Sequence, residues 1–236
     1  MERDKEIVEF QQKALRAQIN PHFLFNALNS IQNFAFKNDV YQLSNYIEKF
    51  ATLTRSILKH SENEYISLRQ EIDVLKNYMD IEKLRYQNFN YSLTVDKNID
   101  DEMIFVPSLL FQPIVENAIW HGFQNSEKFG NLRINFILKD QLIKIEIEDN
   151  GVGRNFKNRK NHDSKGMSLI ESRLKLLNNR NTQINIIDKK NEKENLGTLV
   201  EIIMPLLTIQ NTIKVKKPLI KLMYEMIRKY FNKIKR

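Results

Sequence analysis

A histidine follows a proline at the start of a helical pattern, in the segment Gln-Ile-Asn-Pro-His-Phe-Leu-Phe-Asn-Ala-Leu-Asn-Ser at residues 18–30. A neutral imidazole, with an ordinary pKa of about 6.5, is an available nucleophile near neutral pH. His22 shares a polar helix face with Asn26, whose amide can orient a water molecule for attack on a phosphorylated His22. Most histidines in helices have a structural role. Pro21 interrupts the helix at this point, however, and local backbone strain is more common at functional sites.

A second polar group falls in the segment Gln-Pro-Ile-Val-Glu-Asn-Ala-Ile-Trp-His-Gly at residues 112–122. Asn117 and His121 are four residues apart and share one face of the expected helix. An asparagine carbonyl is a hard oxygen ligand that suits Mg²⁺, and Glu116 can assist through water. The alternative, in which Asn117 and Glu116 only cap or brace the helix, stays open. A zinc site at His121 is not expected, because no second histidine or cysteine has suitable spacing.

The third group is Asp-Asn-Gly-Val-Gly at residues 149–153, at the end of an expected strand. A buried Asp149 can accept a hydrogen bond from the exocyclic amine of adenine, while Gly151 and Gly153 let the backbone approach the base. A hairpin turn is the alternative, although no strand is expected for about 30 residues afterwards. Lys165 precedes Gly166, which opens a helix whose N-terminal amides can bind phosphate. Together with His22, this site suggests ATP-dependent phosphorylation of the histidine.

Composition excludes several classes of protein. The chain has no cysteine, so disulfides and thiolate metal sites are absent. No apolar run approaches the roughly 18 residues needed to cross a bilayer, and no signal peptide is visible. Residues 214–236 hold nine of the 37 basic residues and one of the 29 acidic ones, so the rest of the chain is neutral. We therefore expect no nucleic-acid partner for the body of the protein.

Hydrophobic periodicity predicts an α+β protein. A helical hairpin comes first, broken at Asn38-Asp39, and its surplus of apolar side chains predicts a four-helix bundle with a second copy of the chain. A two-layer α/β sandwich follows, with a mostly antiparallel sheet and helices on one face. The expected helices are 3–36, 41–58, 68–87, 107–120 and 167–177, and the expected strands are 91–95, 132–138, 143–147, 183–187 and 198–204.

Taken together, these segments resemble the sensor histidine kinases of the autolysis-sensor (LytS-like) type over about residues 10–206. Residues 20–26 are similar to that family's phosphoacceptor motif and residues 115–122 to its N box. Residues 149–153 and 165–174 are similar to its first and second glycine boxes. The set is specific because the segments occur in the family's order.

The resemblance implies a fold of the gyrase and histidine kinase type, with ATP and Mg²⁺ as cofactors. His22 would accept the γ-phosphoryl group and pass it to an aspartate of a response regulator. Asn117 would hold Mg²⁺ and Asp149 would recognise adenine. The nucleotide site would also include the residues Glu116, His121, Gly151, Gly153, Lys165 and Gly166. The expected domains are 1–65 for dimerisation and phosphoacceptance, 66–206 for ATP binding, and 207–236 as a tail.

Three departures from the family's pattern bear on activity. Phe23 stands where many histidine kinases have an acid, so the general base is unassigned. Pro113 stands where ATP-hydrolysing cousins have a glutamate, and the second glycine box has a single glycine. A catalytically silent ATP-binding dimer that acts as a regulator or scaffold is therefore the alternative function.

The tail reads as a basic amphipathic helix, with apolar residues from Leu219 to Ile234 on one face and lysines mostly on the other. It either packs on the body or docks on an anionic membrane surface or a membrane sensor partner. We expect a cytoplasmic protein, with peripheral attachment to the inner face of the membrane if the tail binds lipid.

Overall fold

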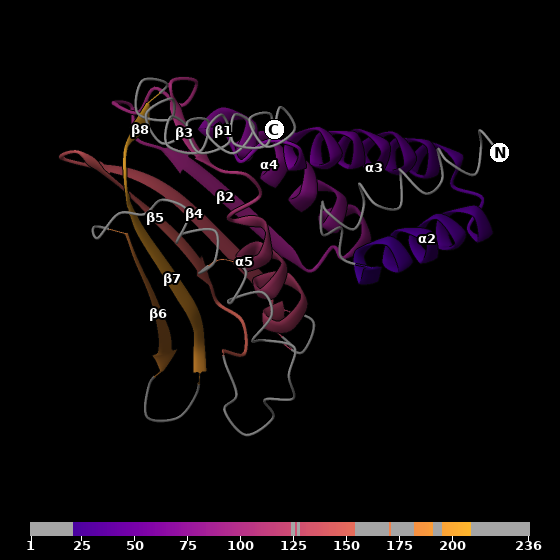
Figure 1. Cartoon of the computed structure of the whole chain (residues 1–236). Helices are drawn as coiled ribbons and strands as arrows, with labels where there is room; N and C mark the ends of the chain where they lie inside the picture. The colour runs from indigo at the N-terminus through magenta and orange to yellow at the C-terminus, as the bar shows by residue number, and fades with distance from the viewer. Residues whose placement is uncertain are drawn as a thin grey trace, which may run out of the picture.

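The structure is a computed structural model that describes residues 21–123, 126, 128–153, 170, 182–190 and 195–208. It combines helices with a mixed sheet and confirms the predicted α+β class (Figure 1). None of the helices within these ranges is both long and apolar enough to cross a membrane. The tail at 207–236 and the expected helix at 167–177 lie almost entirely outside the described residues, as does the part of the expected helix 3–36 that precedes Pro21.

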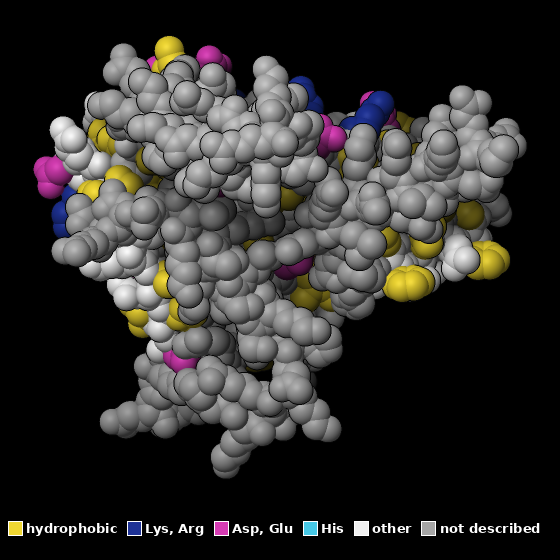
Figure 2. Space-filling model, in the orientation of Figure 1, with side chains coloured by type: hydrophobic (Ala, Val, Ile, Leu, Met, Phe, Trp, Pro, Cys, Tyr) yellow, Lys and Arg dark blue, Asp and Glu magenta, His cyan; other side chains and the backbone are white. Residues whose placement is uncertain are grey.

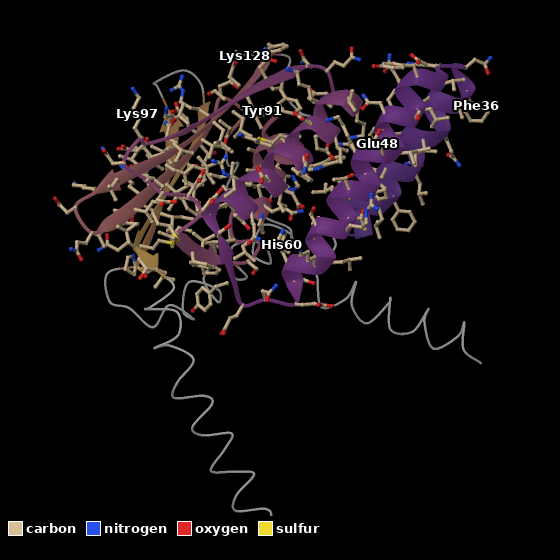
Figure 3. All side chains as sticks on the ribbon, turned by 90° about the horizontal axis from the view of Figure 1, so that it is seen from above. Phe36, Glu48, His60, Tyr91, Lys97 and Lys128 are labelled. Carbon is tan, nitrogen blue, oxygen red and sulfur yellow. The ribbon has the colours of Figure 1, made fainter. Side chains whose placement is uncertain are left out.

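A helical hairpin opens the described chain. Helix α2 (Pro21–Phe36) and helix α3 (Val40–Ser61) are separated at the predicted break, where Asn38 adopts a left-handed backbone with φ of 53°. Asp39 caps α3, because its carboxylate accepts a hydrogen bond from the backbone N–H of Gln42 at 3.0 Å. Seen from above, Phe36 lies at the turn end of the hairpin, and His60 lies at the opposite end of α3 (Figure 3).

Five strands form the main sheet in the order β2-β4-β5-β7-β6. Only β2 and β4 are parallel, and the other neighbouring pairs are antiparallel. The strands are β2 (Phe89–Val95), β4 (Gly130–Lys139), β5 (Leu142–Asp149), β6 (Gln183–Lys190) and β7 (Asn195–Pro205). Alternate residues of β4 and β5 are buried, which is the period of two that the sequence showed.

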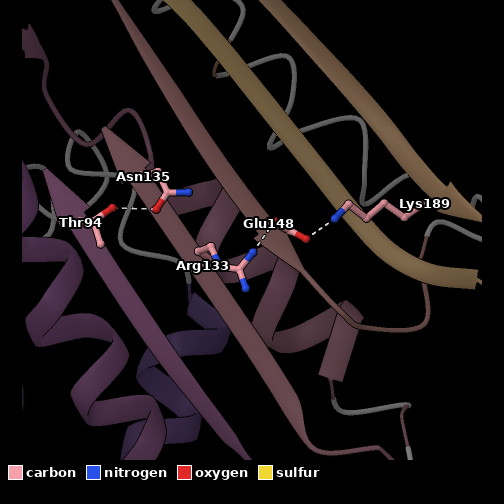
Figure 4. A network of polar contacts seen from close by, with 5 residues as sticks. All are labelled: Thr94, Arg133, Asn135, Glu148 and Lys189. Atoms are coloured by element: carbon pink, nitrogen blue, oxygen red, sulfur yellow. Dashed lines mark hydrogen bonds and ion pairs between the residues drawn. The ribbon is translucent and has the colours of Figure 1, made fainter. Parts of the chain in front are cut away.

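The two faces of the sheet differ in chemistry. Buried isoleucines of β4 and β5 form one face, and Figure 1 shows helices over one side of the sheet. The opposite face carries a polar network across the strands (Figure 4). Thr94 donates to Asn135 at 2.7 Å, Arg133 lies 3.2 Å from Glu148, and Lys189 also pairs with Glu148. The strand positions that alternate with the buried residues therefore carry this polar network.

Helix α4 (Leu68–Arg85) joins the hairpin to the sheet. Ser67 caps it, and the Gln70 side chain completes a capping box by accepting from the Ser67 backbone N–H. The α4 residue Asp80 accepts a hydrogen bond from the Tyr91 hydroxyl of β2 at 2.5 Å and lies 3.4 Å from the Lys49 ammonium of α3. Helix α4 is therefore tied to both halves of the described chain.

The predicted helix from Pro107 to Trp120 is wrong at its start. Pro107 instead ends strand β3 (Ile104–Pro107), which lies between β1 (Tyr65–Ser67) and β8 (Leu207–Thr208) in a small antiparallel sheet. The helix begins later, as α5 (Gln112–Asn117), and continues as the π-helix η1 (Ala118–Phe123). Proline supports either a strand end or a first helical turn, so its presence did not distinguish them.

The apolar side chains of the hairpin are only partly buried. Ile47 of α3 is 45% exposed, whereas Tyr46 beside it is buried. In α2, Phe23 and Ala27 are buried against the rest of the chain, while Leu24 and Leu28 are exposed. Part of the apolar surplus of the hairpin is therefore exposed in the described chain.

Candidate functional site

Asp149 is the last residue of β5 and is buried, with 8% of its surface exposed. The backbone N–H of Gly151 donates to its carboxylate at 2.8 Å. Burial raises the pKa of Asp149 to about 6, and backbone hydrogen bonds from Gly151 and Thr198 oppose that rise. A buried acceptor thus stands at the strand end, where the sequence predicted recognition of adenine.

Two glycines bring the second and third motifs together. A Cβ atom built on Gly151 would lie 2.5 Å from both the Cα and the carbonyl oxygen of Gly122, so only glycine allows this approach. The Gly122 carbonyl also accepts a hydrogen bond from the Val152 N–H at 3.1 Å. Gly153 follows with φ of 69°, a conformation that favours glycine. The end of η1 and the turn after β5 therefore form one local structure.

A third strand contributes residues that the sequence reasoning missed. Gly197 of β7 has φ of 106°, and a Cβ atom there would lie 1.9 Å from the backbone oxygen of Asp149. The next residue, Thr198, is buried and hydrogen-bonds to the Asp149 carboxylate through its backbone. A glycine directly before an alternating strand was the available signal, because glycine in a strand often marks close backbone approach.

The helix that precedes Gly122 carries the candidate metal ligands. Asn117 is half-buried at the end of α5, and His121 is exposed on η1. The Glu116 carboxylate accepts a hydrogen bond from the Gln112 side chain at 2.9 Å. The switch from α-helix to π-helix after Asn117 is a rare feature that is frequent at functional sites. Hard oxygen atoms at the end of a short helix suit Mg²⁺.

A buried carboxylate fixes where this helix begins. Glu71 of α4 is fully buried and accepts backbone hydrogen bonds from Leu109 at 2.9 Å and from Phe111 at 3.1 Å. Leu109 adopts φ of 54°, which is unfavourable for a branched side chain. The bonds to Glu71 therefore hold the turn before α5 in a conformation that the turn alone would not favour.

The first turn of α2 holds His22 and is anchored through its neighbour. Phe23 is 4% exposed, and its ring centroid lies 5.6 Å from that of Phe50 in α3 and 5.5 Å from that of Tyr78 in α4. Asn26 is half-buried one turn later. The described contacts thus join the His22 turn to α4. Lys165 and Gly166 lie outside the described residues.

The hairpin exposes several hydrophobic side chains, some of which are visible in the region of α2 in Figure 2. Its exposed side chains are Leu24 at 36%, Phe25 at 66%, Leu28 at 58%, Phe36 at 85%, Val40 at 74%, Tyr41 at 82% and Ile47 at 45%. Large apolar side chains exposed together on one pair of helices are typical of an interaction site.

Comparison with known sequences gives related proteins of one kind. A model of the histidine kinase family matches residues 10–89. The sensor histidine kinase YesM of Bacillus subtilis is 36% identical over 149 residues, which is 62% of this chain and 25% of YesM. The sensor histidine kinase BtsS of Escherichia coli is 35% identical over 165 residues, which is 69% of this chain and 28% of BtsS. The chain thus spans about a quarter of these relatives.

The resemblance stated from the motifs is confirmed by a third relative, and a solved structure shares the fold. The sensor protein LytS of Staphylococcus epidermidis is 33% identical over 142 residues, which is 60% of this chain and 24% of LytS. A histidine kinase domain from a blue-light activated histidine kinase of Erythrobacter litoralis has a similar structure, with a TM-score of 0.51 and 15% identity. That similarity covers 86% of this chain and 94% of the other.

Proposed function

Because this chain is related to the LytS-like sensor histidine kinases, we propose that it is an ATP-dependent protein histidine kinase. In this proposal His22 takes the γ-phosphoryl group and passes it to an aspartate of a response regulator. The contact between Gly122 and Gly151 supports the proposal most directly, because it unites the Asn117 helix with the buried Asp149 in one site. The domain limits 1–65, 66–206 and 207–236 belong to the same proposal.

The residues around Asp149 fit an adenine nucleotide. The buried carboxylate accepts a hydrogen bond from the adenine amine, and the bare backbone at Gly151 and Gly153 leaves room for the flat base. Asn117 offers an amide oxygen to Mg²⁺, with Glu116 and His121 close to it in sequence on the same helical segment. Bound Mg²⁺ would neutralise charge on the phosphate oxygens. Lys165 and Gly166 complete the proposed phosphate site.

His22 supplies the nucleophile. A lone pair of its neutral imidazole forms the new nitrogen–phosphorus bond, and the bond from the γ-phosphorus to the bridging oxygen breaks. ADP leaves with that electron pair, and the imidazole later loses its remaining ring proton to solvent. The chain's own contribution is positioning and charge neutralisation, since phosphoryl transfer needs little further covalent chemistry. Asn26, one turn after His22, would orient a water molecule for hydrolysis of the nitrogen–phosphorus bond.

Incubation with γ-labelled ATP and Mg²⁺ tests the reaction. We expect label that is stable in base and labile in acid, because phosphohistidine has that chemistry, and we expect chelation of Mg²⁺ to abolish it. Asn117→Ala should lose at least about 90% of the label while it still binds nucleotide, because metal positioning is worth several kcal/mol of the barrier. Nucleotide binding without any label would instead favour the silent regulator or scaffold.

We also infer that the active form is a homodimer. The exposed apolar face of α2 and α3 would be buried when two hairpins form a four-helix bundle. In such a dimer one four-helix bundle would carry both His22 side chains. Each would meet a nucleotide site first and a response regulator afterwards.

The tail is proposed to hold the protein at the inner face of the cytoplasmic membrane. Its nine basic residues would each contribute about 1 kcal/mol near an anionic surface. We expect flotation with acidic vesicles, little flotation with neutral ones, and loss of acidic-vesicle binding when residues 214–236 are removed. Equal flotation of the shortened protein would refute this role.

A further inference from the structure

Tyr78 of α4 is in contact with both parts of the proposed reaction machinery. Its ring centroid lies 5.5 Å from that of Phe23, the residue directly after His22. Its hydroxyl oxygen accepts a hydrogen bond from the indole N–H of Trp120 at 3.2 Å. Trp120 lies three residues after Asn117, in the same helical segment. One side chain therefore connects the neighbour of the phosphoacceptor with the helix of the proposed metal ligand.

Trp120 is held from another direction as well. The Arg85 guanidinium carbon lies 3.7 Å from the centroid of the Trp120 ring, a cation–π contact. Arg85 is itself paired with Glu82, which is 1% exposed. The indole is thus fixed by a hydrogen bond and a stacked cation, both from α4, and it has little freedom to move independently of that helix.

We propose that Tyr78 is a positioning residue that holds the His22 turn and the Asn117 helix in a fixed relation, and so sets the rate of phosphoryl transfer. The inference rests on the proposed function. It adds to that function a specific route of contacts, from Phe23 through Tyr78 to Trp120, that couples the position of the His22 turn to that of the Asn117 helix.

Packing makes this route rigid. Tyr78 has no exposed surface, so its ring cannot move without opening a cavity or displacing Phe23. Transfer between two separately held groups is sensitive to displacements of about 1 Å. The described hydrogen bonds of Asp149 come from Gly151 and Thr198 rather than from α4. Loosening Tyr78 should therefore slow transfer and leave nucleotide affinity nearly unchanged.

Tyr78→Phe tests the route because it keeps the ring beside Phe23 and removes only the acceptor for Trp120. We expect labelling of the full chain by γ-labelled ATP to slow about 10-fold, because that factor corresponds to the net free energy of one hydrogen bond. The dissociation constant for ATP should stay within about twofold of the wild type. Trp120 is the only tryptophan in the chain, so its emission spectrum should shift in the same variant.

Tyr46→Phe is the matched control. Tyr46 is also buried, and its hydroxyl hydrogen-bonds with Ser30, but both residues belong to the hairpin. This variant should keep the wild-type labelling rate and Trp120 emission. Phe23→Leu should slow labelling as well, and combining it with Tyr78→Phe should add less than the product of the two single effects, because both act through one contact.

The results separate this inference from the proposed function. If the wild type takes no label, the kinase proposal fails, and Trp120 emission still tests the route: Phe23→Leu must then alter the emission change that ATP causes. The inference is overturned if Tyr78→Phe labels at the wild-type rate. It is equally overturned if Phe23→Leu leaves the response of Trp120 to ATP unaltered, or if Tyr46→Phe slows labelling as much as Tyr78→Phe.

Discussion

Replacing Asp149 with asparagine is expected to weaken ATP binding by about 30-fold or more, measured by titration calorimetry in the presence of Mg²⁺. A hydrogen bond to a charged group contributes about 1.5–3 kcal/mol, and about 2 kcal/mol corresponds to that factor. The amide can still accept the 2.8 Å bond from Gly151, so the turn should keep its shape. The loss should therefore appear in affinity, while the folded structure around the turn stays the same.

The same variant should be more stable than the wild type at pH 7 to 8. Burial raises the pKa of Asp149 from 3.8 to about 6, so the folded state resists ionisation of this carboxylate. Compared with a neutral side chain at this position, Asp149 does not change the free energy of unfolding below about pH 4. As the pH rises through about 6, its ionisation lowers that free energy. A shift of about two pKa units corresponds to about 3 kcal/mol, of which asparagine should recover a large part.

Unfolding by urea at several pH values checks this sign. Glu82 also has a raised pKa, about 7, mainly because of its burial, so the wild type alone would report both groups. The difference between wild type and Asp149→Asn isolates Asp149, and it should grow between about pH 4 and pH 7. A variant that binds ATP as tightly as the wild type would remove Asp149 from the nucleotide site. A stability difference that shrinks with rising pH would contradict the burial argument.

Local patterns predicted the main sheet well, for a physical reason. Residues of β4 and β5 alternate between buried and half-exposed positions because one face of the sheet packs on the core. The turn residues Asn38 and Asp39 likewise predicted the break in the hairpin. Asn38 adopts a left-handed backbone there, and the Asp39 side chain caps the next helix. These features depend on neighbours in sequence, so a sequence contains them directly.

Features that depend on distant partners escaped prediction. The small sheet of β1, β3 and β8 joins segments that lie far apart in the sequence, and none of them has enough residues to show a period. Gly197 is required by its approach to Asp149, about 50 residues away, and although a glycine beside an alternating strand signals a close approach, it does not reveal the partner. The bonds from Leu109 and Phe111 to Glu71 are of the same kind.

The candidate site follows the same division. Asp149, Gly151 and Gly153 carry a local signature and were recognised, and the structure adds why Gly151 must be glycine. Nothing in the sequence distinguishes Tyr78 within its helix, and Trp120 appears only as one member of the segment 115–122. Their hydrogen bond joins residues 42 positions apart, so only the fold shows it. Residues that position a site are therefore harder to find in a sequence than residues that bind within it.

Replacing His22 with glutamine should abolish acid-labile labelling completely, a loss of at least about 100-fold, while ATP affinity stays within about twofold. Glutamine has a similar length and polarity but no basic ring nitrogen, so no nitrogen–phosphorus bond can form. Because Phe23 anchors this turn of α2 through Phe50 and Tyr78, the helix should remain in place. Autoradiography after filtration at alkaline pH measures the loss.

Other histidines provide the control for that result. The chain has four, and His60 is 8% exposed, so its imidazole is poorly placed to meet a nucleotide. His162→Gln, at a residue to which no role is assigned, should label as the wild type does. Label that survives in His22→Gln and disappears in His121→Gln would move the phosphoacceptor to the exposed histidine of η1. The motif around Pro21 would then have only a structural role, because acid-labile label requires a phosphorylated imidazole and His22 would not be the one that carries it.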